Sequence, residues 1–209
     1  MSQSRTPRRR MKTYTTPIIA GEFKGRQIEI PSVATTRSSK SILRESLFNT
    51  LQFDLLGKPF VEVFAGSGSI ALEAVSRGAS RAWCMEQNRD VYGILCANVE
   101  RIAPGRIDTV WGDSFTEFEG VYRALEATGE RAYFYFDPPF SIREGMEEIY
   151  DKTLKLLERI EPAQCEMAIV EHMTTVDLPE HIGTLERVKK RRFGKSTLSY
   201  YRPAGRDEA

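Results

Sequence analysis

The chain contains few of the residues that build metal centres or disulfide frameworks. Its 209 residues include three cysteines and two histidines. The cysteines are odd in number and widely spaced, which argues against both a disulfide framework and a zinc cluster, and we expect no metal. No apolar run approaches the roughly 18–20 residues needed to cross a bilayer, and no signal-peptide core follows the basic N-terminus. These absences predict a cytoplasmic protein with no membrane partner.

The chain also lacks a large net charge, but its charges are unevenly distributed. The formal net charge is +1 at pH 7. Residues 1–45 hold ten basic side chains against three acidic ones, and residues 186–206 hold eight against one, so the stretch between them is acidic. Two basic segments around an acidic centre predict a polyanionic partner bound at a defined face. The alternative is that these segments bind no partner and are only a disordered basic tail and one solvent-exposed strand.

Local patterns indicate a small hairpin followed by alternating strands and helices. Residues 18–20 and 27–30 predict a β-hairpin, and residues 39–53 have the apolar spacing of a helix. The remaining predicted strands are 60–64, 82–85, 106–111, 133–136, 166–171, 184–193 and 196–202, and the helices are 70–77, 90–102, 116–127 and 144–159.

The alternation predicts an α/β fold with a doubly wound, mostly parallel, seven-stranded Rossmann-like sheet. The last two strands would form an antiparallel C-terminal hairpin at its edge. The expected domains are a basic tail with a β-hairpin extension over residues 1–36 and the sheet domain over residues 37–209.

A short motif, Asp137-Pro138-Pro139-Phe140, closes the aromatic strand at 133–136. The strand ends there because proline cannot donate a ladder hydrogen bond. In open α/β sheets, ligands bind at the carboxyl ends of the strands. A carboxylate, outward backbone carbonyls and an aromatic ring suit the binding of a planar base by its exocyclic amino group. A plain strand terminator is the alternative.

The three preceding strands of the alternation also end in residues that suit a ligand. These are Glu62, Phe64, Ala65, Gly66, Ser67 and Gly68 after the first strand, Glu86 and Gln87 after the second, and Asp113 and Ser114 after the third. Glycines allow close backbone approach, and the helix N-terminus that follows them offers free N–H groups. The acid at 86 can accept both hydroxyls of a ribose, and the pair at 113–114 can bind adenine edges. The glycine spacing matches a dinucleotide fingerprint only loosely.

This series resembles the class I S-adenosylmethionine-dependent methyltransferases. In that class the Gly-rich turn holds the methionine part, the second-strand acid holds the ribose, and an Asp/Asn-Pro-Pro-aromatic motif marks transfer to an amino nitrogen. The chain is most similar to the bacterial 16S ribosomal RNA guanine-N2 methyltransferase family known as RsmD, over about residues 17–202. The segments that carry the resemblance are 18–26, 43–49, 64–68, 73–79, 137–140 and 192–197.

The resemblance implies S-adenosylmethionine as cofactor and methyl transfer to the N2 amine of a guanine in 16S ribosomal RNA. The RNA would be naked or part of a small-subunit particle, and the protein a monomer. Three positions depart from the family pattern: Glu62 replaces an aspartate, Ser38 replaces a proline, and Phe140 replaces a more frequent tyrosine.

On this interpretation Asp137 and the Pro138 carbonyl accept the two N–H bonds of the target amine, the rigid turn completes the site through Pro139, and Phe140 stacks on the flipped base. The predicted phosphate contacts are Lys24, Arg26, Arg37 and Arg44, all in basic N-terminal sequence. Two other functions stay open: an amino-methyltransferase acting on DNA adenine or cytosine, and a catalytically inactive RNA-binding module. A nicotinamide-linked oxidoreductase is a more distant alternative.

Overall fold

A computed structural model describes residues 11–32, 37–139 and 148–205, without the side chains of residues 37–39. The strands are β1 (Thr13–Pro17), β2 (Gln27–Pro31), β3 (Phe60–Glu62), β4 (Ala82–Glu86), β5 (Ile107–Trp111), β6 (Ala132–Phe136), β7 (Cys165–Met173), β8 (His181–Ile182), β9 (Leu185–Phe193) and β10 (Ser196–Pro203). The helices are α1 (Arg37–Leu51), α2 (Ser69–Ser76), α3 (Arg89–Ile102), α4 (Ser114–Glu126) and α5 (Ile149–Leu157). None of the described helices has the length and apolar character needed to cross a bilayer.

The main sheet follows the order β5-β4-β3-β6-β7-β10-β9-β8. The five adjacent strands β5, β4, β3, β6 and β7 are parallel to one another. The strand β10 is antiparallel to both of its neighbours, β7 and β9. It follows that β9 runs in the same direction as β7. The predicted mostly parallel sheet with an antiparallel C-terminal hairpin is confirmed. It has one more described strand than predicted, because the two-residue β8 pairs with β9.

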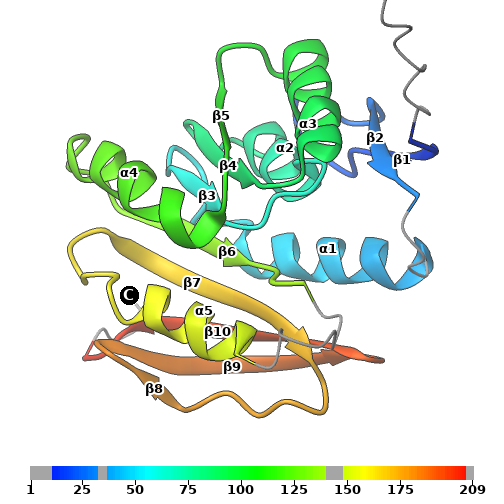
Figure 1. Cartoon of the computed structure of the whole chain (residues 1–209). Helices are drawn as coiled ribbons and strands as arrows, with labels where there is room; N and C mark the ends of the chain where they lie inside the picture. The colour runs from blue at the N-terminus through cyan, green and yellow to red at the C-terminus, as the bar shows by residue number, and fades with distance from the viewer. Residues whose placement is uncertain (1–10, 33–36, 140–147, 206–209) are drawn as a thin grey trace, which may run out of the picture.

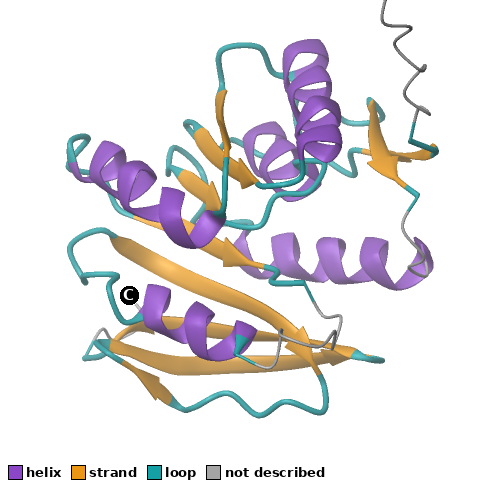
Figure 2. Ribbon diagram, in the orientation of Figure 1, coloured by secondary structure: helices purple, strands orange, loops and turns teal. Residues whose placement is uncertain are grey.

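Helices cover both faces of the sheet, as Figures 1 and 2 show. Along β6, Tyr133 and Tyr135 pack in the core cluster that contains α1, α2 and α3. Phe134 and Phe136 pack on the opposite face, in the cluster that contains α4 and α5. The strand is apolar throughout because both of its faces are buried. The doubly wound arrangement is therefore confirmed.

The N-terminal hairpin is present, but its first strand is not the predicted one. The strand β1 comprises Thr13–Pro17, which pairs antiparallel with β2, and residues 18–20 lie outside it. Ile18 instead begins the turn: its N–H donates to the Arg26 carbonyl, and its carbonyl accepts from Gly25. Its side chain is 1% exposed and belongs to the main core. The prediction was wrong because Ile18 owes its burial to the turn packing on the sheet domain, not to strand pairing.

The N-terminal extension packs tightly on α2. The Glu22 N–H donates to the Ser76 carbonyl over 2.7 Å, and a Cβ on Gly21 would lie 1.8 Å from that carbonyl oxygen. Gly21 also has φ +87°, which glycine adopts without steric cost. The buried Ile18, Phe23 and Ile28 join the same core cluster as α1, α2 and α3. The extension therefore shares a core with the sheet domain.

Candidate active site

The carboxyl ends of the parallel strands place Glu62, Glu86, Asp137 and Glu171 at one edge of the sheet. In Figure 1 the arrowheads of β6 and β7 point to the same side of the molecule. Because the strands are parallel, their carboxyl ends lie at the same edge of the sheet, which is where open α/β sheets bind ligands.

The Gly-rich turn after β3 has the backbone conformation that glycine permits. Gly66 and Gly68 have φ +54° and +75°. A Cβ on Gly66 would meet nothing within 4 Å, whereas one on Gly68 would lie 2.4 Å from Leu95 Cδ1. The turn is thus open above Gly66 and closely packed at Gly68, where α2 begins. This geometry fits a ligand that approaches the backbone at Gly66.

Glu62 lies beneath this turn and is 2% exposed. Its Oε2 accepts a hydrogen bond of 2.8 Å from the Ala71 N–H in the first turn of α2, and it also contacts the Cys84 thiol. Burial raises the pKa of Glu62 to about 8, although the helix N–H groups oppose the shift. These contacts order the Gly-rich turn from inside, and a direct cofactor contact by Glu62 stays a prediction.

Glu86 lies at the end of β4, half-buried, and joins the turn to α3. Its Oε2 accepts from the Gly66 N–H over 2.9 Å, and its Oε1 accepts from the Asn88 N–H over 2.6 Å. Burial raises the pKa of Glu86 above its ordinary value, against the effect of these N–H bonds. The exposed Trp111 lies directly opposite Glu86 in the β4–β5 register, and its indole N–H donates to the Gln87 carbonyl. Gln87 itself is exposed.

The other predicted cofactor residues divide into exposed and internal groups. Asp113 is exposed and caps α4 by accepting from the Phe115 N–H. Ser114 is buried, and its hydroxyl donates to the Val63 carbonyl, so it braces the turn. Phe64 is half-buried and meets Phe115 edge to face, with ring centroids 5.4 Å apart. The remaining two members of the turn are mostly internal: Ala65 is 5% exposed and Ser67 6%.

Asp137 belongs to a charged cluster that the sequence did not predict. The Lys40 ammonium lies 2.8 Å from Asp137 Oδ2 and 2.8 Å from Glu171 Oε1. The Tyr135 hydroxyl donates to Glu171 Oε2 over 2.6 Å. Burial and the neighbouring Glu171 charge raise the pKa of Asp137 to about 6, with Lys40 opposing them. Two carboxyl groups thus share one ammonium at the end of β6 and β7.

The Asp-Pro-Pro turn leaves the Asp137 carboxyl group accessible. The Asp137 side chain is 27% exposed, whereas the Glu171 side chain is 1% exposed. Pro138 is buried and Pro139 is half-buried. Phe140 lies outside the described residues. Of the two carboxyl groups in the cluster, Asp137 is therefore the one that a substrate can reach.

Lys40 is the functional candidate that sequence reasoning missed. The sequence marks it only as one of several basic residues near the N-terminus. It is separated from Asp137 by 97 positions and from Glu171 by 131, so no local spacing relates the three. The one available signal was its place in the first turn of a predicted helix that precedes the sheet.

The predicted phosphate contacts have different environments in the structure. Lys24 and Arg26 are exposed, and Arg26 also donates to the Ile102 carbonyl at the end of α3. Arg44 is only 4% exposed; it donates to the Pro17 carbonyl over 2.7 Å, and its Nε lies 3.9 Å from Glu73. The prediction that Arg44 binds RNA is wrong, because its guanidinium is turned into the protein. The Arg37 side chain lies outside the described residues.

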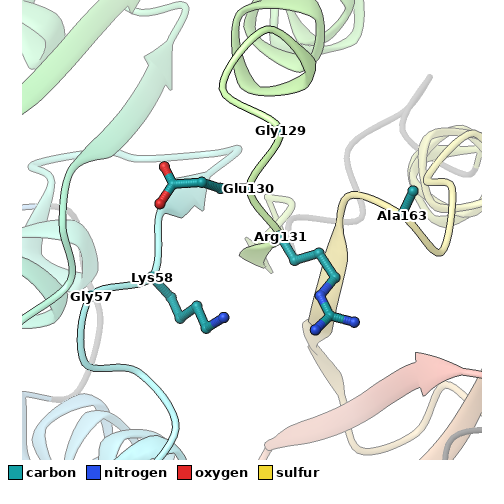
Figure 3. Close-up of a pocket in the computed structure, with 6 residues that line it drawn as sticks. All are labelled: Gly57, Lys58, Gly129, Glu130, Arg131 and Ala163. Carbon is teal, nitrogen blue, oxygen red and sulfur yellow. The ribbon is translucent and has the colours of Figure 1, made fainter.

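A separate hollow of about 500 Å³ lies on the opposite edge of the sheet (Figure 3). Its lining residues are Gly57, Lys58, Gly129, Glu130, Arg131 and Ala163. They precede β3, β6 and β7, so the hollow is at the amino ends of these strands. It contains none of the predicted site residues and is far from the Asp137 cluster in the fold.

Comparisons with known proteins show which family the chain belongs to. The family model described as "Conserved hypothetical protein 95" matches residues 16–202. "Putative rRNA methyltransferase YlbH" of Bacillus subtilis (strain 168) is 28% identical, over 90% of this chain and 99% of its own length. "Ribosomal RNA small subunit methyltransferase D" of Escherichia coli (strain K12) is 33% identical, over 68% of this chain and 66% of its own length.

A solved structure is also similar over almost the whole chain. "Putative methyltransferase yhhF from Escherichia coli" has a TM-score of 0.70 and 26% identity, covering 92% of this chain and 100% of its own. The family match covers most of the chain, and it includes the Gly-rich turn, Glu86 and the Asp-Pro-Pro turn. The chain therefore belongs to the "Conserved hypothetical protein 95" family, the RsmD family of S-adenosylmethionine-dependent methyltransferases that its motifs indicated.

Proposed function

We propose that this protein transfers a methyl group from S-adenosylmethionine to the exocyclic N2 amine of a guanine in 16S ribosomal RNA of the small subunit. Membership of the family, with relatives named as ribosomal RNA methyltransferases, supports the cofactor and favours ribosomal RNA over DNA. The observation that carries the proposal is the accessible Asp137 carboxyl group at the end of β6, followed directly by the Pro138 carbonyl.

The residues at the strand ends fit the cofactor. The open space above Gly66 admits a ligand close to the backbone, and Glu86 provides a half-buried carboxylate suited to ribose hydroxyls. Asp113 and Gln87 are exposed beside it for the adenine edge. When bound, S-adenosylmethionine would supply the methyl group: its C–S bond to the methyl would break as the new N–C bond forms, S-adenosylhomocysteine would leave, and the methylated nitrogen would release one proton.

The protein's contribution at the target base is to orient the amine. The N2 lone pair of guanine is delocalised into the ring, so the amine is a poor nucleophile. The Asp137 carboxylate and the Pro138 carbonyl would accept its two N–H bonds and turn the lone pair toward the methyl donor. Positioning in a water-excluded site, with a carboxylate near the nitrogen as positive charge develops there, supplies most of the rate. Phe140 would stack on the extruded base.

Contacts to the RNA backbone would position the target. We assign phosphate contacts to Lys24 and Arg26, which are exposed, and to Arg37 at the start of α1. Such contacts fix the register of the RNA, whereas the Asp-Pro-Pro turn selects the amino group. Arg44 has no part in this set.

The test is methyl transfer by an Asp137→Ala variant. With tritiated S-adenosylmethionine and a 16S ribosomal RNA transcript, this variant should lose transfer while binding the cofactor within a few-fold of the wild type. Asp151→Ala, at an exposed position on α5, should keep full transfer. Retained turnover by Asp137→Ala would refute the proposed role, and transfer to DNA in preference to RNA would point to the DNA-directed alternative.

A further inference from the structure

The Lys40 ammonium is positioned to control the charge of Asp137. Helix α1 brings it to the carboxyl edge of the sheet, where it lies 2.8 Å from Asp137 Oδ2 and 2.8 Å from Glu171 Oε1. Tyr135 fixes the other oxygen of Glu171. A carboxylate has two oxygens with several lone pairs, so a bond from Lys40 to Oδ2 leaves Oδ1 able to accept from a substrate. Lys40 and a substrate amine can therefore donate hydrogen bonds to the Asp137 carboxylate at the same time.

In the part of the chain that the structure describes, the other ionisable groups that interact with Asp137 are all acids. Glu171 comes from β7, Tyr135 from β6, Glu62 from β3, and Tyr150 from α5; each of the last three interacts electrostatically with Asp137. Among these groups and Lys40, the lysine alone carries positive charge. Neighbouring carboxyl groups disfavour each other's ionisation, and a cation within about 4–6 Å restores it. The ionised state of Asp137 thus depends on Lys40.

We propose that Lys40 is a positioning residue for methyl transfer, which holds the Asp137 carboxylate ionised and correctly oriented beside Glu171 to accept the target amine. This inference rests on the proposed role of Asp137. It adds a residue from α1 to a site whose other members come from the sheet. A protonated Asp137 loses acceptor capacity and repels the amine N–H, so the rate should follow the ionisation of this group.

The proposal predicts a shift of the pH–rate profile. The acid limb is the part of the profile on which the rate falls as the pH is lowered. In the wild type its midpoint should lie near the Asp137 pKa of about 6. Removing an opposite charge at this range raises a carboxyl pKa by about 1–3 units, so Lys40→Met should move the limb toward neutral or alkaline pH. For a shift of about two units, transfer at pH 7 falls roughly ten-fold and recovers as the pH is raised. Cofactor affinity should stay within a few-fold.

Three further variants separate charge from packing. Lys40→Arg should restore much of the wild-type limb, because it keeps the positive charge. Glu171→Gln should move the limb toward acid, because it removes a like charge. The double variant Lys40→Met/Glu171→Gln should return the limb toward the wild-type pH, which a merely structural lesion would not do. Lys58→Met, at the opposite edge of the sheet, should leave the profile unchanged.

The outcomes distinguish this inference from the proposed function. If Asp137→Ala abolishes transfer but Lys40→Met leaves the acid limb in place, the Lys40 inference is refuted and the function stands. If Lys40→Met lowers the rate equally at every pH, and the double variant Lys40→Met/Glu171→Gln is no more active than Lys40→Met, the role of Lys40 is structural and the inference is refuted. If Asp137→Ala remains active, the proposed function of the site fails.

A second, independent observation concerns residues 191–195, which comprise the end of β9 and the connection to β10 and are called the β9–β10 turn below. The strand register aligns Phe136 with Val170, Val170 with Ser199, and Ser199 with Lys190. Residues 191–195 therefore extend past the level of Phe136, at the same edge as Asp137. Three strand spacings separate β6 from β9, or about 14 Å across the sheet. The turn is thus within reach of RNA that presents a base to Asp137.

The charges of this turn are available for an anion. Arg191, Arg192 and Lys195 are exposed, and no carboxylate in the described part of the chain forms an ion pair with them. By contrast, Arg187 and Lys190, which lie further back on β9, pair with Asp177. The geometry points to this turn as a contact for RNA phosphates flanking the target base, within the RNA-directed function proposed above.

The test is the salt dependence of binding to a 16S ribosomal RNA transcript, which needs no turnover. Arg192→Ser/Lys195→Ser should weaken binding and reduce the slope of log K against log salt by about 1.4–1.8, since each phosphate contact contributes about 0.7–0.9. Lys58→Ser/Arg131→Ser removes the same charge at the opposite edge and should leave the slope unchanged. If both double variants changed the slope equally, a specific contact between the β9–β10 turn and RNA phosphates would be refuted. If Arg192→Ser/Lys195→Ser left the slope unchanged while Asp137→Ala still abolished transfer, this RNA contact would be refuted and the proposed function would stand.

Discussion

Replacing Glu73 by alanine should detach the N-terminal extension from α2. This carboxylate is fully buried and accepts from the Ile19 N–H over 2.8 Å and from the Ala20 N–H over 3.1 Å. It also lies 2.8 Å from Arg77 Nε and 3.9 Å from Arg44 Nε. One side chain thus joins the extension, α1 and α2. In the variant, two backbone donors and the Arg77 guanidinium lose their acceptor, and the buried Arg44 guanidinium loses a neighbouring opposite charge.

The expected loss follows from these contacts. Breaking a buried ion pair by removing one partner costs about 3–5 kcal/mol, because it leaves uncompensated buried charge. For a chain of this size, that corresponds to a decrease in Tm of roughly 6–20 °C. Glu73→Gln keeps an acceptor oxygen, so this variant should lose less free energy of unfolding than Glu73→Ala.

Urea denaturation followed by circular dichroism measures this loss. The matched control is Glu119→Ala on α4, whose side chain is 39% exposed and contacts Arg123 and Arg159 at the surface. Exposed pairs contribute at most about 1 kcal/mol, so this variant should remain close to the wild type. If Glu73→Ala lost no more free energy of unfolding than Glu119→Ala, the reasoning about the buried anchor would be refuted.

Three further predictions test other parts of the structure. Gly21→Ala should lose more stability in thermal unfolding than Gly25→Ala, since both have positive φ but only Gly21 has a backbone atom, at 1.8 Å, in the space of the new Cβ; equal losses would contradict the close packing. The pKa of Glu62, raised to about 8 by burial, exceeds its unfolded value of about 4.3, so its contribution to stability is present at low pH and lost as the pH rises toward 8. Glu62→Gln should therefore flatten the fall in unfolding free energy between pH 5 and 8.5, and an unchanged fall would speak against a protonated Glu62. Glu86→Gln should weaken S-adenosylmethionine binding about ten-fold or more in calorimetry, because charged hydrogen bonds contribute about 1.5–3 kcal/mol, whereas the exposed Glu100→Gln should have no effect.

The repeating part of the fold could be predicted from sequence because its signals are local. From Phe60 onward, runs of apolar residues alternate with amphipathic helices and Gly-containing turns, and most observed elements begin and end close to the expected residues. The exceptions are β8, which was not predicted, and α5, which begins at Ile149; residues 144–147 of the predicted helix 144–159 lie outside the described residues. The N-terminal hairpin was harder, because Ile18 is apolar for packing and not for strand pairing. A buried side chain in a turn has no periodicity that a sequence pattern can detect.

The site was predicted where its residues follow strands directly, and missed where it depends on distant contacts. Glu86 and Asp137 end strands, so their place at one edge follows from the parallel sheet. Lys40 and Glu171 meet across 131 positions, and Arg44 turns inward because Glu73 lies on the neighbouring helix. Charge alone could not separate the exposed Lys24 from the buried Arg44, since both occur in the same basic stretch of sequence.

Mapping the modified nucleosides of small-subunit ribosomal RNA is the decisive test of methyl transfer to a guanine N2 amine. The RNA would be isolated from cells with and without this protein and digested for mass spectrometry, with complementation by wild type and by Asp137→Ala. One N2-methylguanosine should disappear without the protein and return only with the wild type. An unchanged nucleoside pattern, loss of a different methylated nucleoside, or recovery with Asp137→Ala would contradict it.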